Sequence, residues 1–199
     1  MNCSREDIDE IRKKLEKNLS GSRYVHTLGV AYTAASMAMC LGEDYEKAEL
    51  AGLLHDCAKE YSPKELLSMA EENGIPVTES ERNAPQVLHA VLGPLVAKKK
   101  YHVEDPEILS AIRWHTTGTE NMTPLELIVF VADYIEPNRD KAENLPEVRP
   151  LAFRDLTACA SRITEDTLAY LARKGTLADP NTERCGSWLK RQLALRISL

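Results

Sequence analysis

The chain has 199 residues, a length that fits one domain with a substantial buried core. Its apolar fraction of 43% and charged fraction of 28% are ordinary for a soluble globular protein. The net charge of −6 argues against a general nucleic-acid binder, which normally carries a broad basic surface. It does not exclude a small phosphate ligand, which needs only a few local cations.

Neither membrane insertion nor secretion is indicated. No apolar run approaches the roughly 18 residues of a membrane span, and the polar, acidic N-terminus carries no secretory signal. The five cysteines are scattered without a Cys-x-x-Cys pair, which is typical of reduced thiols rather than of a disulfide framework. These features predict a cytoplasmic protein whose residues 1–199 form a single domain.

Helical spacing and helix-boundary residues recur along the whole chain. Ser4 with Asp7 resembles a capping box, and several prolines stand where a first helical turn would begin. The run LELIVFVADYIE could pass for a buried strand, but its Thr-Pro-x-Glu start and the helical context favour a helix. We therefore expect an all-α fold. The predicted helices are Ser4 to about Leu19, 22–41, 45–59, Pro63 to Asn73, one from Pro85, Pro106 to His115, Pro124 to Glu136, about 148–173 and about 181–198.

Ionisable side chains interrupt these apolar helices. The clearest case is the pair His55-Asp56 within LLHDCAK, because ionisable groups in a buried stretch are costly unless they are paired or bound to a metal. Asp133 follows the apolar run 128–132 and needs a cation for the same reason. Imidazole and carboxylate together suit iron, manganese or zinc, and carboxylates extend the range to magnesium. The candidate partners are His26, His55, Asp56, His89, His115 and Asp133.

The spacing around His55-Asp56 also indicates a phosphate ligand. Neighbours on a helix point about 100° apart, so both side chains can meet one ion only at the helix edge, with other ligands arriving from facing helices. Lys59 follows one turn later on the same side, where its ammonium can meet a phosphate oxygen. Two histidines and two aspartates would leave positions of an octahedral ion open for water and phosphate, as hydrolysis requires.

Taken together, these residues resemble the HD superfamily of metal-dependent phosphohydrolases, whose pattern H…HD…D is carried by His26, His55-Asp56 and Asp133. The resemblance is closer still to the bacterial YqeK family and extends over roughly 20–190. It is carried by LLHDCAKEY (53–61), IRWHTTGTENMTPLE (112–126), VADYIEPNRD (131–140) and ADPNTE (178–183). It implies an HD-domain helical bundle with a motif core at about 20–140 and C-terminal helices at 148–198. The implied activity is the symmetrical hydrolysis of diadenosine tetraphosphate into two ADP with an iron ion.

The resemblance also implies roles for individual residues. The metal ligands would be His26, His55, Asp56 and Asp133, and manganese or magnesium are the alternatives to iron. His89 and His115 occupy family positions that either take a second metal or line the substrate phosphates; we favour the phosphate role, because four ligands already complete one site. The substrate-binding residues would be Arg23, Lys59, His89, His115 and Arg139, of which Lys59, His89 and His115 would also be catalytic. The stretch 90–94 after His89 departs from the small residues that are usual in the family.

Other functions remain open at this stage. An HD fold could be a nucleoside monophosphate phosphatase, a guanosine polyphosphate hydrolase or a cyclic-dinucleotide phosphodiesterase, the last disfavoured because no Gly-Tyr-Pro follows the HD pair. The chain could also be a non-catalytic nucleotide sensor, although an intact ligand set speaks against this. The expected partner is a dinucleoside polyphosphate or ADP, without nucleic acid or membrane, and a homodimer is left open.

Overall fold

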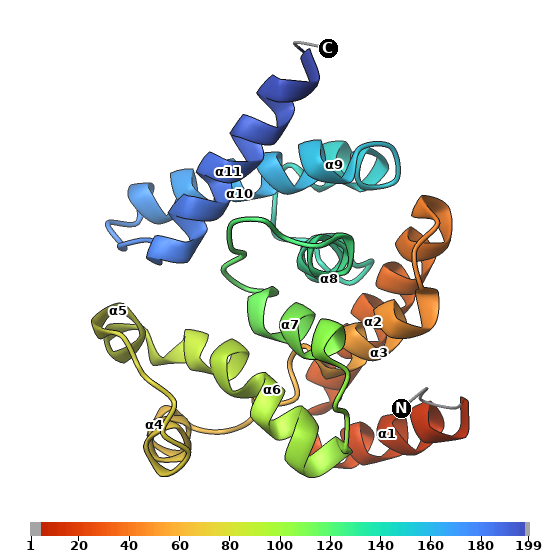
Figure 1. The fold of residues 1–199 in the computed structure, drawn as a ribbon, viewed down its shortest axis with the longest axis vertical. Helices are drawn as coiled ribbons and strands as arrows, with labels where there is room; N and C mark the ends of the chain where they lie inside the picture. The colour runs from red at the N-terminus through yellow and green to blue at the C-terminus, as the bar shows by residue number, and fades with distance from the viewer. Residues whose placement is uncertain (1–4, 198–199) are drawn as a thin grey trace.

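The structure is a computed structural model that describes residues 5–197, and these residues form helices, turns and loops without a strand (Figure 1). The predicted all-α fold is confirmed, while the capping role predicted for Ser4 lies outside the described residues. The helices are α1 (Arg5–Asn18), α2 (Gly21–Leu41), α3 (Tyr45–Leu54), α4 (Pro63–Glu72), α5 (Glu79–Asn83), the 3-10 turn η1 (Pro85–Val87), α6 (Leu88–Tyr101), α7 (Pro106–Trp114), α8 (Pro124–Ile135), α9 (Leu145–Ala152), α10 (Leu156–Arg173) and α11 (Pro180–Ile197).

Local side-chain chemistry explains where several helices begin. Ser62 and Thr123 each start a capping box, in which the hydroxyl accepts from the third helical amide and a glutamate returns a bond to the cap. Asp44 and Asp105 accept two backbone amides each at the starts of α3 and α7. The starts predicted at Pro63, Pro106 and Pro124 are therefore confirmed, each with proline in the first turn.

The structure corrects one predicted helix end that matters for the site. The helix predicted over 45–59 ends at Leu54, and the chain continues in turns through Glu60. The amides of Cys57 and Lys59 donate to the carbonyls of Leu54 and Asp56, three residues earlier in each case. His55 and Asp56 therefore lie in tight turns after α3 rather than inside a longer helix.

Two further differences lie away from the HD pair. The helix predicted over 148–173 is two helices, α9 and α10, because the chain breaks at Phe153 and Asp155 caps a new helix through the amide of Ala158. Pro150 lies inside α9 and cannot supply a backbone amide for a continuous ladder. The short helix α5 was not predicted.

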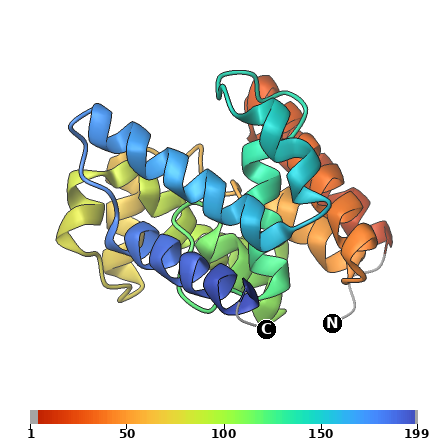
Figure 2. The same ribbon diagram turned by 90° about the horizontal axis from the view of Figure 1, so that it is seen from above.

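Two apolar clusters surround the middle of the molecule. One joins α1, α3, α4, α6 and α7, and the other joins α2 and α8 to α9, α10 and α11. Figure 2 shows α10 and α11 side by side. Among the described residues, none of the helices has the length and apolarity that crossing a membrane requires.

Helices α2 and α3 pack unusually closely because of a glycine. A Cβ at Gly52 would lie 2.8 Å from Cα of Ala31, a separation that packed atoms do not tolerate. The backbones can therefore approach only while position 52 has no side chain. This contact fixes the residue after α3 relative to the middle of α2, and so positions His55 beside His26.

Candidate metal centre

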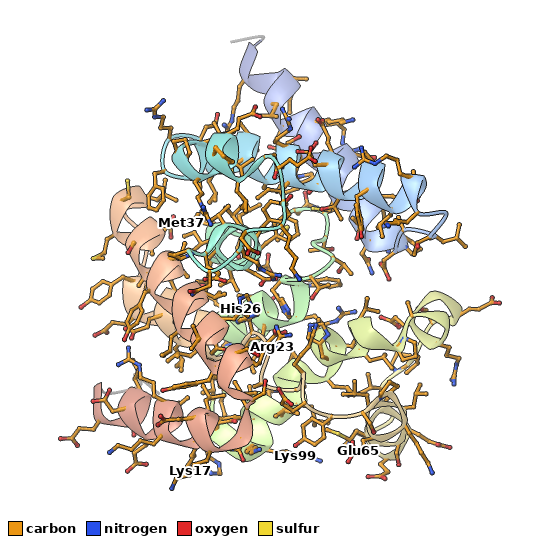
Figure 3. All side chains as sticks on the ribbon, turned by 180° about the vertical axis from the view of Figure 1, so that it is seen from behind. Lys17, Arg23, His26, Met37, Glu65 and Lys99 are labelled. Atoms are coloured by element: carbon orange, nitrogen blue, oxygen red, sulfur yellow. The ribbon has the colours of Figure 1, made fainter. Side chains whose placement is uncertain are left out.

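Four predicted ligands come together from three parts of the chain. His26 lies in α2, His55 and Asp56 follow α3, and Asp133 lies in the last turn of α8. His26 Nε2 is 3.3 Å from His55 Nε2 and 3.1 Å from Asp133 Oδ1. Asp56 Oδ2 is 3.5 Å from His55 Nε2 and 4.0 Å from His26 Nε2. Figure 3 shows Arg23 and His26 close together on α2, near the middle of the molecule.

The spacing of these donor atoms fits a bound divalent ion. Metal–nitrogen and metal–oxygen bonds are about 2.1 Å long, so neighbouring ligands lie roughly 3.0 Å apart at a right angle and roughly 3.4 Å apart in a tetrahedron. The separations between His26, His55, Asp56 and Asp133 span that range and slightly beyond it. Imidazole and carboxylate donors that converge in this way are of the types that hold a divalent ion.

Asp56 also faces a second group of histidines. Its Oδ1 lies 3.1 Å from His89 Nε2 and 3.6 Å from His115 Nε2, and these two nitrogens are 3.2 Å apart. His89 is the second residue of α6, and His115 directly follows α7. Asp56, His89 and His115 thus form another set of three donors with the spacing of a metal site. One buried carboxylate links both groups.

Hydrogen bonds fix two of the imidazoles with their Nε2 atoms toward the centre. His55 Nδ1 is 2.6 Å from the carbonyl of Gly52, and His115 Nδ1 is 2.8 Å from the carbonyl of Ile112. A carbonyl oxygen can only accept, so Nδ1 must carry the proton in both rings. Nε2 is then the unprotonated atom of the neutral ring, as a metal ligand requires.

Three cations border the two groups. Arg23 donates to Asp56 Oδ2 at 2.7 Å, and Arg139 donates to Asp133 Oδ1 at 2.7 Å. Lys59 Nζ lies 3.1 Å from His89 Nε2 and 3.9 Å from Asp56 Oδ1. A hollow of about 640 Å³ opens beside His26 and is lined in part by both arginines. The structure therefore brings every predicted site residue together, and pairs each arginine with a carboxylate.

Burial and charge act against each other in this centre. Burial raises the pKa of Asp56, but His55, His115 and His89 lower it by more, so that it falls well below its ordinary value. Burial also raises the pKa of Asp133, but the hydrogen bond with His26 and the neighbouring His55 and Arg139 lower it by more. Burial lowers the pKa of the Lys59 ammonium. The carboxylates are thus ionised and ready to bind a cation.

Three residues that contact the centre were not predicted. Glu136 Oε1 lies 3.0 Å from His26 Nδ1, and Asn138 donates to the other oxygen of the same carboxylate. Thr116 Oγ1 lies 2.9 Å from His115 Nε2 and 3.3 Å from His89 Nε2. Glu136 could have been suspected by the argument that singled out Asp133, because it is a carboxylate at the end of the same apolar helix. The threonine gives no comparable signal.

Comparisons with known proteins agree with this geometry. Residues 23–138 match a family model described as HD domain. The chain is 37% identical to a symmetrical bis(5'-nucleosyl)-tetraphosphatase of Bacillus subtilis, over 88% of this chain and 93% of that protein. A relative with the same name in Halalkalibacterium halodurans is 36% identical over 84% of this chain and 89% of its own.

A solved structure is similar as well. It is the crystal structure of a Clostridium acetobutylicum protein described as a "predicted HD superfamily hydrolase involved in NAD metabolism". The two structures superpose with a TM-score of 0.90 at 35% identity, over 93% of this chain and 97% of the other. The predicted resemblance is confirmed: the chain belongs to the HD-domain family, among the YqeK-like relatives of the symmetrical bis(5'-nucleosyl)-tetraphosphatases.

Proposed function

We propose that this chain is a metal-dependent hydrolase that splits diadenosine tetraphosphate symmetrically into two ADP. The observation that carries the proposal is the convergence of His26 and His55 with two carboxylates, Asp56 and Asp133, beside the ammonium of Lys59. The curated relatives that share most of the chain bear the name of this activity. A dinucleoside polyphosphate is thus the proposed substrate.

The four donors would hold one divalent ion, for which we propose iron, with manganese or magnesium as alternatives. Such an ion, when bound, supplies an activated water at neutral pH and neutralises charge on a phosphate oxygen. The donor spacing given above supports this ligand set, and the neutral Nδ1–H tautomer of His55 leaves its Nε2 atom available. The cytoplasmic location and the single domain stay predictions from the sequence.

The remaining polar groups would bind and orient the phosphate chain. Lys59 is the proposed main contact, because its ammonium stands over His89 and beside Asp56 at the border of the ligand group. His89 would donate a hydrogen bond to a phosphate oxygen, and His115, whose Nδ1 proton is held by the Ile112 carbonyl, would do so once Nε2 also carries a proton. One of the two histidines in its protonated form would protonate the leaving ADP. Arg23 and Arg139 would turn from their carboxylate partners to add charge-assisted bonds.

The position of Lys59 supports the phosphate role of His89 and His115 over a second metal site. A second ion held by Asp56, His89 and His115 would lie close to the ammonium, which is 3.1 Å from His89 Nε2. A divalent ion and an ammonium that share the same neighbouring side chains repel each other. Elemental analysis of the purified protein should therefore give about one metal per chain. A ratio near two would overturn this assignment and make both histidines ligands.

A product assay tests the function itself. Purified protein with diadenosine tetraphosphate and a divalent metal should release ADP alone. Equal amounts of AMP and ATP would contradict symmetrical cleavage. Absence of turnover with that substrate and with simpler nucleotides, in a folded and metal-loaded protein, would refute the enzymatic role and favour a nucleotide sensor.

A further inference from the structure

Glu136 is a buried carboxylate on the far side of the His26 ring from the ligand group. It is 1% exposed, and its Oε1 lies 3.0 Å from His26 Nδ1. The opposite nitrogen of the same ring, Nε2, faces Asp133 and His55. We propose that Glu136 is a positioning residue of the metal centre: it accepts a hydrogen bond from the Nδ1–H group of His26 and so keeps Nε2 directed at the ion. The proposal rests on the metal site of the proposed function.

The location of His26 explains why it needs a side-chain partner. His55 and His115 directly follow α3 and α7, and each donates from Nδ1 to a carbonyl three residues earlier. The last carbonyls of a helix have no amide partner within the helix, so they are available for such bonds. His26 lies inside α2 (Gly21–Leu41), where the carbonyls are occupied by the helical ladder. The acceptor for its Nδ1 must therefore come from another part of the chain.

Glu136 is itself held in place. Its Oε2 accepts from the backbone amide of Asn138 at 2.8 Å and from the Asn138 side chain at 2.9 Å, while Oε1 faces His26. The guanidinium of Arg149 donates to the carbonyls of Ile135 at 2.9 Å and Glu136 at 3.0 Å. The carboxylate is thus fixed at both oxygens and through its backbone. A fixed second partner restricts the orientation of a ligating imidazole.

Gly29 provides the space for this carboxylate. It lies one turn after His26 in α2, where glycine costs a helix about 1 kcal/mol relative to alanine. A Cβ at this position would overlap Glu136 Oε2, and would lie 3.1 Å from the carboxyl carbon and 3.2 Å from Asn138 Nδ2. An alanine here would displace the carboxylate while every ligand and every charge stayed in the chain.

This property makes Gly29→Ala the sharpest test. Metal-free protein is titrated with Co²⁺ alone and followed by visible absorption, after thermal unfolding has shown that each variant is folded. Gly29→Ala and Glu136→Ala should each weaken Co²⁺ binding about 10- to 100-fold, the usual effect of losing such a partner. Glu136→Gln keeps an acceptor and should lose less. The matched control is Gly21→Ala in the same helix, where a Cβ meets nothing within 4 Å and binding should equal the wild type.

A spectroscopic readout separates positioning from general damage to the fold. In Zn²⁺-loaded protein, NMR should show the His26 Nδ1 proton protected from solvent exchange in the wild type and exchanging freely in Gly29→Ala. Wild-type affinity in folded Gly29→Ala and Glu136→Ala would overturn the proposal, as would equal losses in Glu136→Gln and Glu136→Ala. Asp56→Ala is the reference for the site itself. If Asp56→Ala binds Co²⁺ like the wild type, the ligand assignment fails. If Asp56→Ala loses binding while the Glu136 and Gly29 variants bind like the wild type, the ligand assignment stands and only the positioning role fails.

Discussion

Replacing Asp56 with alanine should lower the stability of the metal-free protein. Both carboxylate oxygens are in use, Oδ2 with Arg23 at 2.7 Å and Oδ1 with His89 at 3.1 Å, and the side chain is buried. Breaking a buried ion pair costs about 3–5 kcal/mol. Arg23 keeps 30% of its side chain exposed and can turn toward water, so the lower figure, about 3 kcal/mol, applies. For a chain of this size that corresponds to a fall in Tm of roughly 6–12 °C.

The same substitution should abolish stabilisation by metal. An ion that binds only the folded protein adds about 2.7 kcal/mol of stability at a concentration 100 times its Kd. The Tm of the wild type should accordingly rise by roughly 5–11 °C when Mn²⁺ is added to protein stripped with a chelator. Asp56→Ala should show no such rise, because the carboxylate that faces both donor groups is missing.

Differential scanning calorimetry with and without Mn²⁺ measures both effects. Glu143→Ala, an exposed carboxylate, is the control and should match the wild type in Tm and in its response to metal. A metal-dependent rise in Tm that survives Asp56→Ala would refute the ligand assignment. An unchanged Tm in metal-free Asp56→Ala would show that the ion pair with Arg23 does not stabilise the fold.

Three further changes test the site and the fold. Lys59→Met should lower kcat/KM for diadenosine tetraphosphate about 10- to 100-fold, the loss of one charge-assisted bond, with metal content by elemental analysis unchanged. Gly52→Ala should destabilise the protein by about 1–3 kcal/mol in urea unfolding, because its Cβ would press on Ala31. Burial raises the pKa of Asp105, but Lys47 and the α7 amides lower it by more, so its ionised form stabilises the fold above about pH 4 and this is lost as pH falls. Asp105→Asn should therefore flatten the decline in the free energy of unfolding between about pH 5 and 3. An unchanged decline would contradict the role of the Asp105 carboxylate as the cap of α7.

Much of the helical framework is encoded locally. Ser62-Pro63 and Thr123-Pro124 begin helices through bonds between residues three apart, which a sequence pattern can reveal. The cost of burying ionisable side chains likewise singles out His55-Asp56 and Asp133 from their apolar neighbours in the sequence. The break between α9 and α10 was missed, because helical spacing continues on both sides of Phe153 and only the cap at Asp155 marks it.

What depends on tertiary contacts was not predictable. The turn after Leu54 replaces a helix that the apolar spacing favoured, and its amides bond to carbonyls three residues earlier. Tertiary context can override local propensity in this way. The bond between His26 and Glu136 joins residues 110 positions apart. The division of Asp56 between two groups of histidines is equally invisible in sequence, since it depends on which oxygen faces which helix.

The helix ends explain the construction of the centre. His55 and His115 each follow a helix whose final carbonyls lack amide partners, and each uses one of these carbonyls to fix its own ring. Their tautomers depend only on backbone geometry, so side-chain substitutions at Ile112 cannot remove the acceptor. His26 has no such local acceptor, and its orientation depends on Glu136 and on the space at Gly29. The ligand inside the helix is therefore the one whose ring orientation depends on another side chain, and not on a carbonyl of its own helix.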